Sequence, residues 1–312
     1  MIFDKLSEIL KKDYESSVLA CGFLINPYNF AVVGGTHGYF QGGNSNVIDR
    51  IPVATDQNAV SVGTLLSSKS EMGSAQDIVG GYSYLHGGNT GSHVNVIERH
   101  QNAASANGAD VGDLVNAVRL SSGSESSTHG YSTGGWKGST SDFIEKYVFA
   151  SSSNASDIAN LTIARHRGGG STSSTHGYHH GGHDNGTSYA RIDKYIYSSD
   201  TNATNVGNLT VADTTMCSNE NSTHGYADGF GTDVTKSERY SFSTDGNSAD
   251  VGDLARNGID ASSFSSTNHG YVAKGNVGVA DITKHTFSSS ITSSDVGDLS
   301  TSRSEGKSGT LG

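Results

Sequence analysis

Short stretches in which apolar and polar residues alternate recur along the chain and predict β-strands. In residues 191–197 (RIDKYIY), β-branched and aromatic residues alternate with polar ones, and segments rich in Gly, Ser, Asn and Asp bound the stretch on both sides. None of the recurring units contains about ten residues with apolar positions three and four apart, as a helix requires. The pattern therefore predicts an all-β protein.

Three sequence words recur six times in a fixed order, which identifies a repeat protein. The first word, HGY or a variant, is aligned on tyrosines that lie 45 to 48 residues apart: Tyr39, Tyr84, Tyr131, Tyr178, Tyr226 and Tyr271. The second word, VGDL or a variant, ends at a leucine in every unit: Leu65, Leu114, Leu161, Leu209, Leu254 and Leu299. Between them lies an acidic, basic and aromatic segment such as IEKYVF from Ile144.

The repeat length of about 46 residues matches a four-stranded propeller blade and is too long for leucine-rich or hexapeptide solenoids. We therefore predict a six-bladed β-propeller over residues 36–312, preceded by a short helical or extended segment over residues 1–35. Residues 302–310 resemble the linkers that lead into the HGY strand elsewhere, so the C-terminus is expected to supply the first strand of the first blade. Residues 30–34 are a rival for that strand, and we favour the C-terminal closure.

The order of these words resembles the kelch repeat. It is carried by glycine pairs at Gly42-Gly43, Gly87-Gly88, Gly134-Gly135 and Gly181-Gly182, by the aromatic strand at Tyr147, Tyr195 and Tyr240, and by the closing Arg119, Arg165, Arg256 and Arg303. The chain departs from kelch units because the VGDL word stands where they carry a Trp. The glycine pair also degrades to Gly229-Phe230 and Lys274-Gly275 in the last two units. The resemblance implies a kelch-like propeller.

The motifs HGYxxGG, IDKYxF and DVGDL also resemble those of repeat proteins of tailed phages, notably marine ones. This resemblance implies a virion component, made in the cytoplasm of the host. It carries no catalytic signature.

Composition and charge narrow the function further. The chain has 312 residues, 41 of them Gly and two Pro, and its net charge of −11 argues against a nucleic-acid partner, which demands clustered Lys and Arg. The apolar run 18–25 is shorter than the roughly 20 residues needed to span a bilayer, so no membrane insertion is expected. Cys21 and Cys217 lie in unrelated contexts and imply no disulfide framework.

Five histidines recur at one position of the repeat, where Tyr82 takes the sixth place: His37, His129, His176, His224 and His269. They could form a metal or ligand collar, or each imidazole could donate to a backbone carbonyl as a structural element. Repetition favours the structural interpretation, because a site needed once is rarely copied in every unit.

Other tempting metal motifs are also better explained by structure. His179, His180 and His183 break the repeat, but adjacent strand residues project to opposite faces, so His179 and His180 cannot easily share one ion. Some copies of the DVGD motif lack the Asp residues but retain the apolar residues around them, which indicates a turn rather than a calcium-binding loop. We expect no metal and no cofactor.

Three loops differ between the blades and are the expected ligand-binding elements: residues 134–141, 182–190 and 229–236. Their aromatic and polar side chains suit glycan or protein recognition. The candidate ligand residues are Trp136, His179, His180, His183, Asp184 and Phe230.

Catalysis is not expected. The sequence contains no nucleophile elbow, phosphate loop, HExxH motif or carboxylate pair outside the repeat, so there are no candidate catalytic residues.

Apolar residues at helical spacing near the start of the chain predict a short amphipathic helix: Phe3, Leu6, Ile9, Leu10 and Tyr14. Such a short helix must bury its apolar stripe, either on its own propeller or on another protein. We favour the second case, in which residues 1–35 are a docking segment.

The resulting prediction is a non-enzymatic structural or adhesion protein of a phage tail or capsid. It would bind other virion proteins through residues 1–35 and present its loops to a neighbour or to a host-surface glycan. The alternatives are a glycan-recognising receptor-binding protein at the tail tip, a stabilising decoration, and a cellular kelch-like interaction module.

Overall fold

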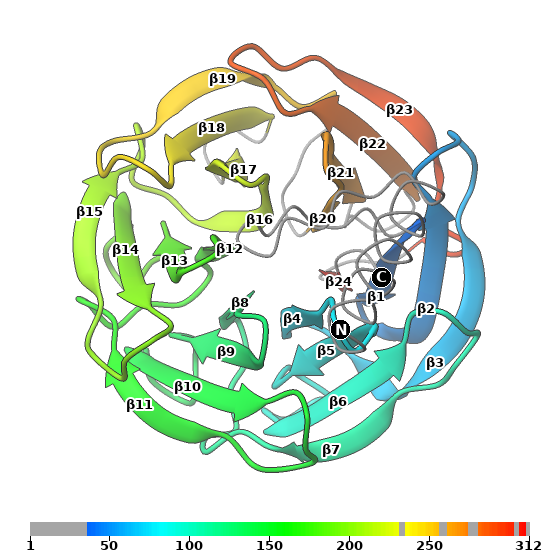
Figure 1. Cartoon of the computed structure of the whole chain (residues 1–312), viewed down its shortest axis with the longest axis horizontal. Helices are drawn as coiled ribbons and strands as arrows, with labels where there is room; N and C mark the ends of the chain where they lie inside the picture. Colours follow the sequence, from blue (N-terminus) through cyan, green and yellow to red (C-terminus); the bar gives the residue numbers. More distant parts are fainter. Residues whose placement is uncertain (1–35, 231–234, 256–260, 274–279, 303–305, 310–312) are drawn as a thin grey trace, which may run out of the picture.

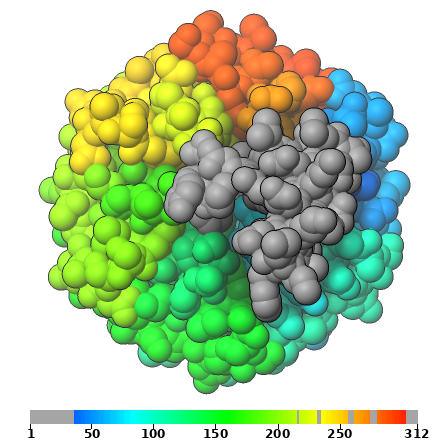
Figure 2. Space-filling model, viewed as in Figure 1, coloured from blue at the N-terminus to red at the C-terminus, as the bar shows by residue number. Residues whose placement is uncertain are grey.

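The computed structural model describes residues 36–230, 235–255, 261–273, 280–302 and 306–309, which form six four-stranded antiparallel sheets arranged in a ring (Figure 1). Successive blades occupy successive sectors of a disc (Figure 2). The prediction of an all-β, six-bladed propeller is confirmed.

Each blade pairs its strands in the order first, second, third, fourth from the axis outwards. Blade 1 consists of β24 (Gly306–Gly309), β1 (His37–Gly42), β2 (Ser45–Pro52) and β3 (Val60–Lys69). Blade 2 consists of β4 (Gly73–Asp77), β5 (Tyr82–His86), β6 (Val96–Gln101) and β7 (Ala109–Asp113). Blade 3 consists of β8 (Ser122–Glu125), β9 (His129–Thr133), β10 (Phe143–Val148) and β11 (Ser156–Asn160).

The second half of the ring repeats this arrangement. Blade 4 consists of β12 (Gly169–Thr172), β13 (His176–His180), β14 (Arg191–Ile196) and β15 (Thr204–Asn208). Blade 5 consists of β16 (Thr215–Glu220), β17 (His224–Phe230), β18 (Lys236–Ser241) and β19 (Ala249–Asp253). Blade 6 consists of β20 (Ser262–Ser265), β21 (His269–Ala273), β22 (Asp281–Thr286) and β23 (Ser293–Asp298).

The ring closes with a strand from the end of the chain. Strand β24 pairs antiparallel with β1, with Tyr39 opposite Gly309 and Gly42 opposite Gly306. The predicted C-terminal closure is therefore confirmed. Because the last strand joins the first blade, β1 is paired on both sides, as the second strand of every other blade is.

The alternation of strand directions gives the disc two distinct faces. On one face the first strand turns into the second, which begins with the recurrent histidine in five blades; we call it the histidine face. On the other face the second strand leads into the third through the variable loops; we call it the loop face. The described chain enters the propeller at Thr36, on the histidine face.

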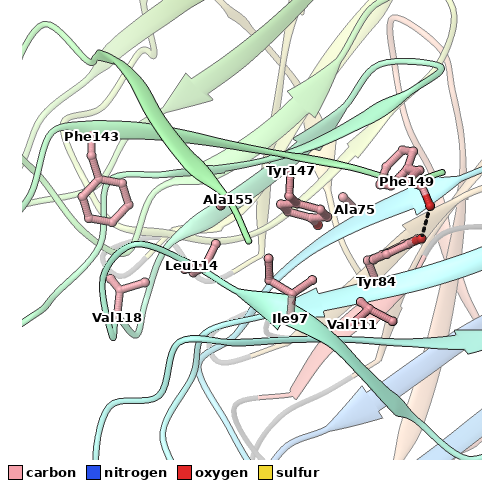
Figure 3. Packing of buried hydrophobic residues seen from close by; sticks show 10 residues of the cluster. All are labelled: Ala75, Tyr84, Ile97, Val111, Leu114, Val118, Phe143, Tyr147, Phe149 and Ala155. Atoms are coloured by element: carbon pink, nitrogen blue, oxygen red, sulfur yellow. Dashed lines mark hydrogen bonds between the residues drawn. The ribbon is translucent and has the colours of Figure 1, made fainter. Parts of the chain in front are cut away.

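The core lies between neighbouring blades. Between blades 2 and 3, Ile97, Leu114 and Phe143 pack together with Tyr84 and Tyr147, all nearly inaccessible to solvent (Figure 3). Burying such a side chain contributes roughly 1.5–3 kcal/mol. The Tyr84 hydroxyl also donates to the carbonyl oxygen of Phe149 at 3.0 Å, so the recurrent tyrosine links one blade to the next.

In five of the six blades, the acidic residue of the third-strand word is also an inter-blade contact. Asp193 of β14 accepts a hydrogen bond from the Thr162 backbone N–H at 2.9 Å, in the linker that follows the last strand of the preceding blade. The same contact recurs at four further blade junctions: Glu98 with Leu66, Glu145 with Val115, Glu238 with Thr210, and Asp49 with Ser300. The buried acids of this word therefore find their hydrogen-bond donors in the backbone of the preceding blade's linker.

Inner strands approach one another closely at the axis. A Cβ atom on Gly123 would lie 1.7 Å from the carbonyl oxygen of Ser74, and one on Gly170 would lie 2.1 Å from the carbonyl oxygen of Gly123. Only glycine fits at these positions, which explains part of the high glycine content.

Candidate functional site

The recurrent histidines hold local turns. In four blades the hydroxyl of the preceding Thr lies within 2.8 Å of the imidazole Nδ1 atom: Thr36–His37, Thr128–His129, Thr175–His176 and Thr223–His224. The predicted hydrogen bond to a backbone carbonyl is therefore wrong, because the neighbouring hydroxyl takes its place. Partial burial lowers the pKa of these imidazoles and of His269.

The prediction that His179 and His180 belong to a ligand loop is wrong. Both lie in β13 and are fully buried, on opposite sides of the strand. His179 Nδ1 lies 2.8 Å from the Thr133 hydroxyl of blade 3, and His180 Nδ1 lies 3.0 Å from the Tyr240 hydroxyl of blade 5. Burial lowers the pKa of both imidazoles, that of His180 to about 3, so both are neutral structural links.

Two further predicted ligand residues have structural contacts. Phe230 ends β17 with its ring fully buried among blade 4 and blade 5 residues, so its assignment to an exposed loop is wrong. Asp184 lies in its loop, but its Oδ1 atom accepts the backbone N–H of Gly186 and its Oδ2 atom accepts the Tyr189 hydroxyl at 2.7 Å. This carboxylate shapes the loop.

The acidic words have a comparable local role. The carboxylate Oδ1 of Asp110 accepts the backbone N–H of Gly112, and Asp250 and Asp295 make the same contact two residues on. Among the described residues, no group of three or more His, Cys, Asp or Glu side chains is placed to hold a metal ion.

Trp136 and His183, in contrast, lie on the loop face, and each is held there by an isolated antiparallel β-bridge to a linker residue. Trp136 and Arg119 exchange two backbone hydrogen bonds, of 2.8 and 3.1 Å, and His183 and His166 exchange two of 2.9 and 3.0 Å. Ser70 and Asn89 form the corresponding pair in blade 2. The backbone of this small bridge is repeated in blades 2, 3 and 4, whereas the side chains that it carries differ among these three blades.

The glycine pair before each bridge sets its direction. Gly134 and Gly135 have φ values of 60° and 107°, and Gly181 and Gly182 have 61° and 92°. Non-glycine residues rarely adopt these angles. The pair thus turns the chain sharply out of the second strand and into the bridge.

The side chains of these bridges form a row of rings across the junction of blades 3 and 4. The ring centroids of Trp136 and His166 lie 5.3 Å apart, with their planes inclined by 37°. Those of His166 and His183 lie 4.2 Å apart, inclined by 44°. Trp136 and His183 are half-buried and His166 is buried, so the row presents a partly exposed aromatic shelf.

A shallow groove of about 430 Å³ runs along this shelf. Beyond the three rings, its lining consists of Arg119, Leu120, Arg167, Asn185 and Thr214. The combination of ring faces with a few polar groups is typical of small-molecule sites.

Strained backbone positions bring the linker residues to the groove. Leu120 and Arg167 occupy equivalent positions in successive linkers and have φ values of 57° and 59°, in the left-handed region. The Arg167 N–H donates to the Leu120 carbonyl oxygen at 3.1 Å, and the Leu120 N–H donates to that of Glu71 at 2.8 Å. Such backbone strain costs about 1 kcal/mol or more per residue and concentrates at functional sites.

His166 is a neutral hydrogen-bonding group. Its Nδ1 atom lies 3.0 Å from the His183 carbonyl oxygen, which can only accept, so Nδ1 carries the proton and Nε2 is an acceptor. Burial, together with the positive charges of Arg167 and Arg119, lowers the pKa of this imidazole to about 4. The ring is therefore uncharged at neutral pH.

The sequence indicated part of this site. Trp136 and His183 were expected as ligand residues, whereas the linker residues Arg119, His166 and Arg167 were not. The sequence predicts that Arg119 and Arg165 are equivalent closing arginines, but in the structure they occupy adjacent positions of the repeat. Arg165 is buried and pairs with Asp193, while Arg119 reaches the groove. The motif ARHRGG around His166, which differs from the other linkers, was the available signal.

The expected docking residues Phe3, Leu6, Ile9, Leu10 and Tyr14 lie outside the described residues. Within the described part of the chain, no helix has the length and apolar character needed to cross a membrane.

No protein-family model matches this sequence, and a search of curated proteins finds no match. The resemblance to kelch repeats thus rests on the sequence motifs alone, and the propeller fold rests on the structure.

Proposed function

We propose that this propeller is a non-enzymatic binding module that holds a saccharide in the groove formed by Trp136, His166 and His183. The observation that carries the proposal is the aromatic shelf. It stands where the repeat is broken, whereas the recurrent histidines, acids and glycines are engaged in structural contacts. His179 and His180 also break the repeat, but they are fully buried between blades, whereas this row of rings is built once and is partly exposed, so a ligand explains it best.

A sugar ring fits the shelf in size and chemistry. The face of a pyranose presents C–H groups that pack on aromatic rings, and its hydroxyls both donate and accept hydrogen bonds. Nε2 of His166 offers an acceptor, and Asn185 and Thr214 offer amide and hydroxyl groups at the edge of the groove. The shallow shape suits one or two residues of an exposed polysaccharide chain.

Screening of the full chain on an array of neutral and acidic oligosaccharides tests this function. We expect binding that Trp136→Ala weakens about tenfold, because the loss of one aromatic contact corresponds to roughly 1–1.5 kcal/mol. Tyr82→Ala is the matched control, since Tyr82 is a half-buried aromatic residue on the histidine face. Binding that Trp136→Ala leaves unchanged would refute the proposed site.

We further propose that the module acts in a phage virion, as a structural or adhesion protein of the tail or capsid attached through residues 1–35. The resemblance of its repeat motifs to those of phage proteins supports a place in the virion. The geometry also suits it: residues 1–35 join the propeller at Thr36 on the histidine face, so attachment there leaves the groove on the opposite face free.

Pull-down from purified, dissociated phage particles tests the attachment. The full chain is expected to capture a virion structural protein, and a full chain with Leu6→Glu and Ile9→Glu is expected to lose it, because charge disrupts the apolar stripe. Equal capture by both chains would contradict docking through residues 1–35. Capture lost together with cooperative unfolding would show that the segment packs on its own propeller.

A further inference from the structure

The charged groups that line the groove are all cationic. Arg119 and Arg167 contribute side chains to its wall, and no Asp or Glu does so among the described residues. This is unusual for a chain whose net charge is −11. The positive character is local, so it marks the ligand rather than the protein as a whole.

Arg119 is largely neutralised but keeps a free donor. Its Nη1 atom contacts both carboxylate oxygens of Glu71, at 3.1 and 2.8 Å. Its Nη2 atom makes no hydrogen bond with the described residues. The Glu71 carboxylate holds the guanidinium in place at the wall of the groove, because both of its oxygens bind one nitrogen.

Arg167 has no such counter-charge. Its half-buried guanidinium forms no ion pair or hydrogen bond with any described residue. Asp184, between the lining residues His183 and Asn185, is not part of the lining, and its carboxylate accepts hydrogen bonds from Gly186, Thr187 and Tyr189. Among the described residues, the groove lining therefore holds one positive charge without an ion-pair partner beside an aromatic shelf.

We propose that the ligand is a carboxylated saccharide, with its sugar ring on Trp136 and its carboxylate on Arg167. This inference rests on the proposed saccharide function and adds the chemical class. A guanidinium presents two parallel N–H donors that match the two oxygens of a carboxylate. The single net positive charge of the lining matches a monoanion.

The neighbouring groups complete this arrangement. The Nη2 donor of Arg119 is available to a second oxygen of the sugar. The neutral His166 ring accepts a hydroxyl proton at Nε2 and adds no charge of its own. The wider negative charge of the protein weakens the binding of strongly charged polyanions elsewhere on its surface.

Calorimetric titration of the full chain with methyl galacturonoside, which carries one carboxylate, and with its methyl ester tests the inference. The two ligands share their rings and hydroxyls and differ only in the carboxylate. We expect the acid to bind at least tenfold more tightly than the ester. Arg167→Met should abolish this preference by weakening the binding of the acid much more than that of the ester, whereas Trp136→Ala should weaken both ligands. Lys284→Met, which removes one positive charge on the histidine face, should preserve the preference.

The outcomes separate this inference from the function on which it rests. Equal binding of acid and ester, both lost in Trp136→Ala, overturns the carboxylate while the saccharide function stands. A preference for sulfated over carboxylated members of the oligosaccharide array also overturns it, because a tetrahedral anion is then the ligand. Binding to no saccharide in the array overturns both proposals.

Discussion

The buried ion pair between Arg165 and Asp193 offers a sharp test of how the blades are held together. Both side chains are inaccessible to solvent, and Nη1 of Arg165 lies 2.9 Å from Oδ2 of Asp193. The guanidinium also donates to the carbonyl oxygens of Gly181, Ile163 and His179 at 2.9 to 3.2 Å. A single side chain therefore satisfies one carboxylate and three backbone acceptors.

Replacement of Arg165 by Met should destabilise the protein by about 4 kcal/mol. Removal of one partner of a buried pair leaves an uncompensated charge, which costs roughly 3–5 kcal/mol. For a chain of 312 residues, with an unfolding entropy of about 2 cal/mol/K per residue, that change lowers the melting temperature by roughly 6 °C. Asp245→Asn is the control, because it breaks the Lys194–Asp245 pair, which has a similar distance of 2.7 Å but an Asp side chain that is 50% exposed. It should cost less than about 1 kcal/mol.

Urea unfolding followed by tryptophan fluorescence and circular dichroism measures both variants. The double variant Arg165→Met with Asp193→Asn should lose less unfolding free energy than the two single variants lose together. The reason is that an uncharged amide then replaces the carboxylate that Arg165→Met leaves without a partner. Asn at position 193 still offers an acceptor to Thr162. If Arg165→Met cost no more than Asp245→Asn, burial would not be the source of the effect and the reasoning would be refuted.

Three more predictions concern the axis and the closure of the ring. Burial raises the pKa of Glu125 above its ordinary 4.5, and burial together with the charge of Glu125 raises the pKa of Glu220, so the folded state keeps these protons at a pH where the unfolded chain loses them. Their contribution to stability is full below pH 4.5 and is lost as the pH rises through the raised pKa values. Melting curves across this range should show that decline flattened in Glu125→Gln, and parallel curves for the two proteins would contradict it. Gly170→Ala should lower the melting temperature markedly, because its Cβ atom would collide with the backbone of Gly123. Gly186→Ala, in an open loop, is the control and should leave the melting temperature nearly unchanged. Deletion of residues 306–312 removes β24 and exposes the inner edge of β1, so hydrogen exchange should rise first in β1; unchanged protection there would contradict closure by this strand.

The sequence by itself determined the architecture. A repeat of 45 to 48 residues with alternating apolar positions has few solutions, because each unit must bury two faces of a small sheet against copies of itself. The closing strand could also be predicted, since the last residues repeat a linker that precedes the inner strand elsewhere. Local pattern and repeat length carry this information without knowledge of any contact.

Only the tertiary structure decided which polar residues are available to a ligand. His179 and His183 lie four residues apart in one histidine-rich word, yet the first is sealed between blades and the second lies on the loop face. A sequence shows the residue type but not which neighbour covers it. The burial of His179 depends on Thr133, which is contributed by the preceding blade.

The groove itself arises from the packing of neighbouring blades. Trp136 comes from a loop of blade 3, His166 from the linker into blade 4 and His183 from a loop of blade 4, and none of these segments predicts the others. Their rings meet because consecutive blades are stacked at a fixed rotation about the axis. The sequence thus determined the ring of blades, whereas the aromatic shelf depends on side chains that only the closed ring brings within contact distance.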